Sequence, residues 1–117
     1  MRGDEARVVA AFERWLTEAG WTVRTEVDFA DVFAQRGEER LYAEAKGRTA
    51  APGLDIDTLY GQLLRRMPPD EVGSARFAVV VPAEAVPHAQ RVNARVRQLL
   101  DIDIYSVDLE NQVTLVA

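Results

Sequence analysis

Three residues whose side chains could take part in catalysis lie in the first half of the sequence: Asp31, Glu44 and Lys46. Hard divalent cations such as Mg²⁺ prefer carboxylate oxygens as ligands, and an ammonium group stabilises negative charge that develops on a reacting centre. Two carboxylates, one divalent cation and one lysine are a minimal set for phosphodiester hydrolysis. Lys46 is the single lysine beside 13 arginines. Codon bias would explain the arginines, but a planar guanidinium cannot replace a compact ammonium at a reacting centre, which favours a special role for this lysine.

A hairpin would bring these three side chains onto one face of a sheet. Residues 30–35 and 40–46 predict two strands, and a two-residue turn at Gly37-Glu38 suits a hairpin that needs positive φ at its first position. Residues then pair when their numbers sum to 75. In this register one face is apolar, and the other carries three pairs: Phe33 with Tyr42, Asp31 with Glu44, and Phe29 with Lys46; the apolar face consists of Ala30, Val32, Ala34, Leu41, Ala43 and Ala45.

The expected opposition of Asp31 and Glu44 has a chemical consequence. Directly opposed residues have Cβ atoms roughly 4.5–5.5 Å apart, so two carboxylates placed this way repel each other unless a cation lies between them. Lys46 is two residues beyond Glu44 and therefore emerges on the same face. The alternative is a solvated strand face that happens to carry Asp, Glu and Lys.

The rest of the sequence predicts one α/β domain, residues 1–117, with the order αβββαβαββ and a mixed sheet flanked by helices on both faces. Asp4 and Asp55 are expected helix N-caps, and Gly61 inside a helix suggests close packing against a neighbour. The third helix should turn five residues inward: Val86, Ala89, Val92, Val96 and Leu99. The expected helices are 5–19, 55–67 and 85–100, and the remaining strands are 21–29, 76–81, 103–107 and 112–116.

Composition excludes several classes of function. The 117 residues contain no cysteine and one histidine, His88, which excludes disulfides, thiol catalysis, cysteine-ligated zinc and polyhistidine metal sites. No apolar run approaches the roughly 18 residues of a membrane span, so the expectation is a cytoplasmic protein with no membrane partner. The net charge of −5 argues against a simple nucleic-acid clamp, but it is compatible with an enzyme whose metal site needs carboxylates.

Residues 4 to about 81 resemble the PD-(D/E)XK nuclease superfamily, the restriction-endonuclease-like fold. The resemblance consists of Asp31, then Glu44-Ala45-Lys46, on a hairpin behind an N-terminal helix, with Gln62 in the following helix. The Asp-to-Glu spacing is similar to that of archaeal Holliday-junction resolvases, and the Gln-Leu helix is similar to that of RecB-type nucleases. The resemblance implies that Asp31, Glu44 and the Ala45 carbonyl bind Mg²⁺ or Mn²⁺, that Lys46 is the catalytic lysine and that Gln62 faces the site.

The resemblance also implies an acidic ligand from the first helix, either Glu5 or Glu13. Glu5 shares the helix face of Val8 and Phe12 and is the better placed of the two. Two departures bear on the details that face DNA: Ala30 replaces the proline before the aspartate, and an arginine replaces the RecB-type tyrosine four residues after Gln62. Three arginines are expected to contact DNA phosphates, a solvated helix end being the alternative for the last two; they are Arg48, Arg65 and Arg66.

Together these features predict a Mg²⁺-dependent DNA endonuclease that hydrolyses phosphodiester bonds. A chain of 117 residues leaves no room for a separate sequence-reading domain, so structure-directed or weakly sequence-specific cleavage is expected. DNA is the expected substrate, and a homodimer or a partner protein would supply further surface. The alternative is a non-catalytic nucleic-acid-binding or assembly module that retains the nuclease fold, which the acidic charge favours. RNA is a third candidate ligand that nothing in the sequence distinguishes from DNA.

Overall fold

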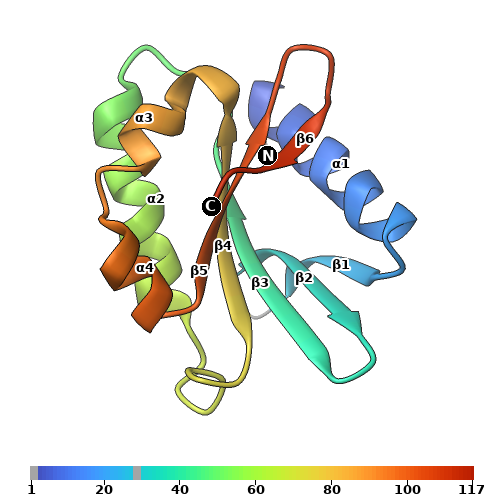
Figure 1. Ribbon diagram of the computed structural model, residues 1–117. Helices are drawn as coiled ribbons and strands as arrows, with labels where there is room; N and C mark the ends of the chain where they lie inside the picture. The colour runs from blue at the N-terminus through green and yellow to red at the C-terminus, as the bar shows by residue number, and fades with distance from the viewer. Residues whose placement is uncertain (1–2, 28–29) are drawn as a thin grey trace.

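The computed structural model describes residues 3–27 and 30–117, which fold as a six-stranded mixed sheet between two layers of helices (Figure 1). The strands are β1 (Thr22–Val27), β2 (Ala30–Arg36), β3 (Glu39–Ala45), β4 (Arg76–Pro82), β5 (Ile102–Val107) and β6 (Val113–Leu115). The helices are α1 (Gly3–Glu18), α2 (Pro52–Arg66), α3 (Val86–Ala89) and α4 (Ala94–Leu99), with a 3₁₀ turn at Ala83–Ala85.

The strands lie in the sheet in their order along the chain, from β1 to β6. β1, β2 and β3 form an antiparallel meander, β4 and β5 continue parallel to β3, and β6 closes the far edge antiparallel to β5. α1 covers one face, and α2, α3 and α4 cover the other (Figure 1). This architecture confirms the predicted α/β class. No helix within the described ranges is long and apolar enough to cross a membrane.

The hairpin between β2 and β3 has the predicted register. Gly37 adopts a φ of 60° in the turn, and the paired residues sum to 75 from Arg36 opposite Glu39 to Val32 opposite Ala43. Ala30 departs from the prediction because it packs in the α2-side core, and not on the α1 side with Val32. The change of face at Ala30 occurs where the regular pairing of β2 with β3 ends, after Val32. The expected pairing of Phe29 with Lys46 lies outside the described residues.

The core consists of two clusters, one on each face of the sheet. β4 separates them, and its residues from Phe77 to Val81 are fully buried, as the unbroken apolar run predicts. On the α1 side, Phe12 packs its ring 4.8 Å from that of Tyr105, and Trp15 lies 5.3 Å from the same tyrosine. The N-terminal helix is therefore held on the sheet by a strand near the other end of the chain.

The prediction of one helix over 85–100 is wrong. The segment breaks into α3 and α4, and the Asn93 side chain caps α4 by accepting the Val96 amide at 2.9 Å. Because the break reorients the second half, Val96 and Leu99 are 39% and 67% exposed and not turned inward. Arg97 takes a buried position in their place, and its Nε donates to the Val92 carbonyl at 2.9 Å.

Both predicted aspartate N-caps are also wrong. Asp4 and Asp55 lie inside the first turns of α1 and α2, where carboxylates remain favourable beside the helix N-terminus. α2 starts at Pro52, whose missing N–H costs nothing in a first turn. The expected close packing at Gly61 is absent as well, since a Cβ built there meets nothing within 4 Å.

Candidate functional site

Asp31 and Glu44, the carboxylate pair, lie together where β2 and β3 separate. Glu44 projects from β3, is 1% exposed and pairs along the sheet with Val79 of β4. The Asp31 carboxylate accepts the Ala45 amide at 2.8 Å, and the Asp31 amide donates to Glu44 Oε2 at 3.2 Å. Each carboxylate is thus hydrogen-bonded to the backbone of the opposite strand, which replaces the regular ladder at this point.

Arg66, at the last position of α2, supplies positive charge to the carboxylate pair. Its Nη1 lies 2.5 Å from Glu44 Oε1, and its side chain remains 35% exposed. The sequence predicts this arginine at a DNA phosphate, whereas the structure directs it to a buried carboxylate. The pairing depends on how α2 crosses the sheet, and no local sequence pattern reports that.

The surroundings of Glu44 disfavour its negative charge. Burial, followed by the nearby charge of Asp31, raises the pKa of Glu44 to about 7, although Arg66 and the Asp31 amide both act to lower it. Two adjacent carboxylates with one of them buried are the donor set that a hard divalent cation prefers. The residues therefore fit a Mg²⁺ or Mn²⁺ site.

Lys46 follows β3 directly, and its backbone amide donates to the Val80 carbonyl at 3.0 Å. The residue is half-buried and lines an open pocket of about 400 Å³ at the carboxyl end of β3. Within the described parts of the chain, no carboxylate oxygen lies within 4.0 Å of its ammonium nitrogen. The other residues that line this pocket are Asp4, Glu5, Gly47, Arg48, Thr49 and Asp55.

Glu5 is the acidic residue of α1 that lies with these groups. Burial and the charge of Asp31 raise the pKa of Glu5, and the charge of Lys46 acts in the opposite direction. These effects place Glu5 within electrostatic reach of both predicted site residues. Glu13 lies more than two turns further along α1 and does not line the pocket.

The segment after β3 is fixed against α1 by contacts that the sequence does not predict. A Cβ on Gly47 would lie 2.4 Å from the Glu5 backbone nitrogen, so only glycine fits here. The Asp4 carboxylate accepts the Arg48 amide at 2.6 Å and also binds Arg7, whose Nε lies 2.7 Å away. The Asp-x-x-Arg spacing on α1 is the available sequence signal for this arrangement.

The remaining predicted residues lie at the edges of the site. Gln62 is half-buried one turn before Arg66, and its side chain makes no hydrogen bond to residues 3–27 and 30–117. Arg65 is exposed, and Arg48 lies with its Nε 3.2 Å from the carboxylate of Glu84. Among the described residues, no three His, Asp or Glu side chains are gathered closely enough to form a metal cluster. A cation held by Asp31 and Glu44 would therefore need further ligands.

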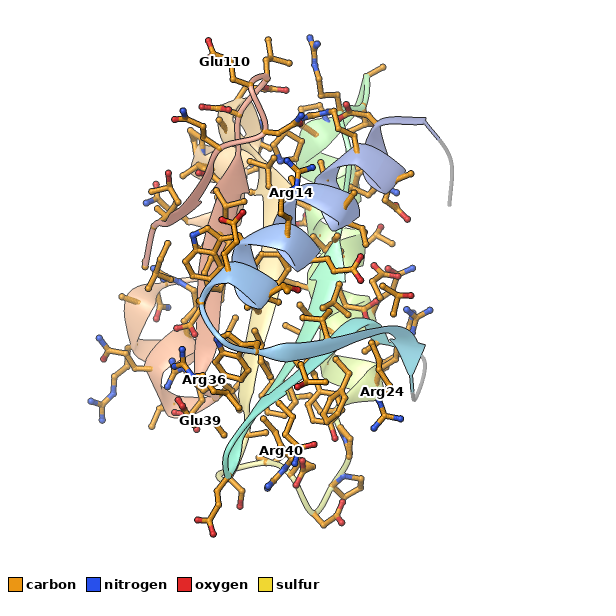
Figure 2. The ribbon with its side chains drawn as sticks, turned by 90° about the vertical axis from the view of Figure 1, so that its right-hand side faces the viewer. Arg14, Arg24, Arg36, Glu39, Arg40 and Glu110 are labelled. Atoms are coloured by element: carbon orange, nitrogen blue, oxygen red, sulfur yellow. The ribbon has the colours of Figure 1, made fainter. Side chains whose placement is uncertain are left out.

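The arginines around β1 and the β2–β3 hairpin do not form a free basic track. Figure 2 shows Arg24, Arg36 and Arg40 at this end of the face that α1 covers. Arg36 forms an ion pair with Glu39, and Arg40 lies 2.5 Å from the carboxylate of Glu71. The charges of Arg36 and Arg40 are thus largely neutralised within the chain.

The fold matches two solved structures. One is an XisH family protein from Nostoc punctiforme PCC 73102, with a TM-score of 0.60, 17% identity and coverage of 92% of this chain and 96% of that one. The other is an fdxN element excision controlling factor protein from Anabaena variabilis, with a TM-score of 0.60, 16% identity and coverage of 93% and 96%. No family model and no curated protein matches the chain. At these identities, the likeness concerns the fold.

Proposed function

We propose that this chain is a metal-dependent nuclease that acts on DNA, with Asp31, Glu44 and Lys46 at its centre. The observation that carries the proposal is the carboxylate pair, in which Glu44 is 1% exposed beside Asp31 and has a pKa of about 7. Holding two carboxylates this way destabilises the metal-free fold, and such arrangements cluster at functional sites. A divalent cation would remove the repulsion.

Each residue near the pair has a role in this proposal. Asp31, Glu44, the Ala45 carbonyl and Glu5 would hold Mg²⁺ or Mn²⁺, which when bound would polarise a phosphate and activate a water molecule. Lys46 lines the adjacent pocket and would stabilise negative charge on the phosphate. Beside them, Gln62 would orient the substrate, and two arginines would bind neighbouring phosphates: Arg48 and Arg65.

DNA is the substrate that the structural likeness favours. One protein of the same fold is described as an element excision controlling factor, and excision of a genetic element is a process on DNA. The net charge of −5 is unfavourable for DNA binding, and Arg36 and Arg40 are paired with carboxylates of the chain. We therefore infer weakly specific or structure-directed cleavage, with a second copy or a partner protein supplying further DNA contacts.

The test is cleavage of supercoiled plasmid and of a synthetic branched DNA with Mg²⁺ or Mn²⁺, with EDTA as the metal-free control. Wild type should cut, and Lys46→Ala and Asp31→Asn should not. Arg14→Gln, at an exposed position of α1 away from the pocket, is the matched control and should cut like wild type. Folded wild type that cuts neither DNA contradicts the proposal, and cutting that survives Lys46→Ala shows that the site is misplaced.

A second candidate is a non-catalytic DNA-binding or assembly module with the same fold. The observation that favours it is the ion pair of Arg66 with Glu44, which supplies the carboxylate pair with a cation from the chain itself. Such a module would bind DNA in a salt-dependent manner without turnover and would not require a divalent metal.

A further inference from the structure

We infer that Arg66 competes with a divalent cation for Glu44 and so sets how tightly the carboxylate pair binds metal. The inference rests on the proposed function because it concerns the same site. It assigns Arg66 the role of a positioning residue, which holds Glu44 in place while no metal is bound.

The geometry around Glu44 leaves a cation few ways to reach it. Both carboxylate oxygens already have partners, since Oε1 lies 2.5 Å from Arg66 and Oε2 accepts the Asp31 amide at 3.2 Å. Glu44 is 1% exposed, so solvent water supplies no further contact to its carboxylate. A metal ion that binds Oε1 therefore meets the Arg66 guanidinium on the same oxygen, and one that binds Oε2 lies close to the same positive charge.

Arg66 is the donor that can leave. The Asp31 amide belongs to the backbone of β2 and cannot withdraw without opening the strand pair. The Arg66 guanidinium stands at the end of a flexible side chain that is 35% exposed, at the last position of α2 before the extended Met67. Moving it breaks no helical hydrogen bond of its neighbours.

Charge balance leads to the same conclusion. Asp31 and Glu44 carry two negative charges when ionised, and Arg66 already compensates one of them. A divalent cation bound to Glu44 beside a retained guanidinium would be repelled by it in a largely buried place. By linkage, whatever free energy Arg66 gains from Glu44 is subtracted from metal binding.

The test measures Mn²⁺ binding by electron paramagnetic resonance on DNA-free protein, under argon at about pH 8, where Glu44 is mostly ionised. Arg66→Gln should bind Mn²⁺ about tenfold more tightly than wild type or better, given the coupling measured between close charge pairs. Arg14→Gln removes the same charge at an exposed position of α1 away from the pocket and should stay within about twofold of wild type. Glu44→Gln should lose the site.

The outcomes separate this inference from the proposed function. If wild type binds Mn²⁺ and Arg66→Gln binds no more tightly, the inference is overturned and the nuclease proposal stands. If only Arg66→Gln binds, the inference holds and the non-catalytic module is favoured. If no folded variant binds Mn²⁺, both proposals fail.

A second measurement requires no substitution. In wild type, the NMR signal of the Arg66 Nε–H should shift and exchange faster with water as Mg²⁺ saturates the site, because the guanidinium leaves Glu44. An Arg66 signal that stays unchanged while the Ala45 amide responds to Mg²⁺ would contradict the inference.

Discussion

Glu44 is buried at a position where its charge is disfavoured, and this makes the stability of the fold depend on pH. Its folded pKa of about 7 lies above the ordinary value of 4.5. Below pH 4.5 the Glu44 carboxyl is protonated in both the folded and the unfolded chain, and its contribution to the stability of the fold is at its maximum. Between 4.5 and 7 the folded chain binds more protons, so this stabilisation is lost as pH rises.

Glu44→Gln should therefore flatten the pH dependence of stability in metal-free buffer. When the pH is raised from about 4 to about 8, wild type should lose about 3 kcal/mol of unfolding free energy through the ionisation of Glu44. The variant should not show this loss, because glutamine cannot ionise. Urea unfolding at both pH values measures this change. Glu18→Gln, at an exposed position of α1, is the control, and parallel profiles for wild type and Glu44→Gln would contradict the prediction.

Part of this residue-scale arrangement could be predicted from sequence. The register of the hairpin follows from a two-residue turn at Gly37, and it brings Asp31 beside Glu44. The partnership of Glu44 with Arg66 could not be predicted in this way, because it depends on the docking of a helix 22 residues further along the chain. Local periodicity fixes which face of α2 is buried but not which strand residue its end reaches.

At the scale of elements, the close contact between the β3–α2 loop and α1 determines the position of Lys46. Gly47→Ala should destabilise the fold by about 1–3 kcal/mol, because the added Cβ would lie 2.4 Å from backbone of α1 that cannot move freely. Thermal or urea unfolding measures the loss.

Gly61→Ala is the matched comparison, because the same methyl group on α2 meets nothing within 4 Å. It should stabilise the fold by about 0.5–1 kcal/mol through helix propensity. Two glycine-to-alanine changes should thus have opposite signs. Equal effects would contradict a close contact between Gly47 and the backbone of α1.

The contact between α2 and α3 depends on one buried hydrogen bond. The Tyr60 hydroxyl donates to the Ala89 carbonyl at 2.6 Å, and burial raises the pKa of Tyr60 to about 12. Tyr60→Phe should cost about 1–2 kcal/mol of unfolding free energy, because the Ala89 carbonyl loses its donor. Tyr105→Phe, in the core cluster on the α1 side of the sheet, is the comparison and should have a smaller effect. An unchanged urea midpoint for Tyr60→Phe would contradict the prediction.

The helices α1 and α2 could be predicted from sequence, because their apolar stripes are long and regular. The third predicted helix was wrong because apolar spacing over 85–100 continues through a break in the backbone. Asn93 is the signal that interrupts it, since its side chain caps a new helix and turns Leu99 to solvent. The buried Arg97 likewise follows from the break and not from the spacing of charges.

At the scale of the whole molecule, the two ends of the chain meet beside the candidate site. Arg7 of α1 binds Asp4 and also donates to the Asp108 carbonyl at 2.9 Å and to Asn111 Oδ1 at 2.7 Å in the β5–β6 loop. α1 is thus tied to the far edge of the sheet as well as to the segment that carries Arg48.

Arg7→Ala should loosen both connections. We expect about 1–2 kcal/mol of lost stability and faster hydrogen exchange at the Arg48 amide, because Asp4 would lose the partner that holds its carboxylate in place. Hydrogen exchange followed by NMR measures the change, with Arg14→Ala as an exposed control on the same helix. Unchanged protection at Arg48 would show that Asp4 does not depend on Arg7.

This connection has a consequence for how the protein is made. Translation delivers α1 before the β5–β6 loop, so a nascent chain on the ribosome holds Asp31, Glu44 and Lys46 before Asp108 and Asn111 exist. Phe12 likewise waits for Tyr105. A partly synthesised chain can therefore hold every proposed catalytic residue while α1 still lacks its contacts with β5 and the β5–β6 loop, so α1 is fully anchored beside these residues only after that loop has been made.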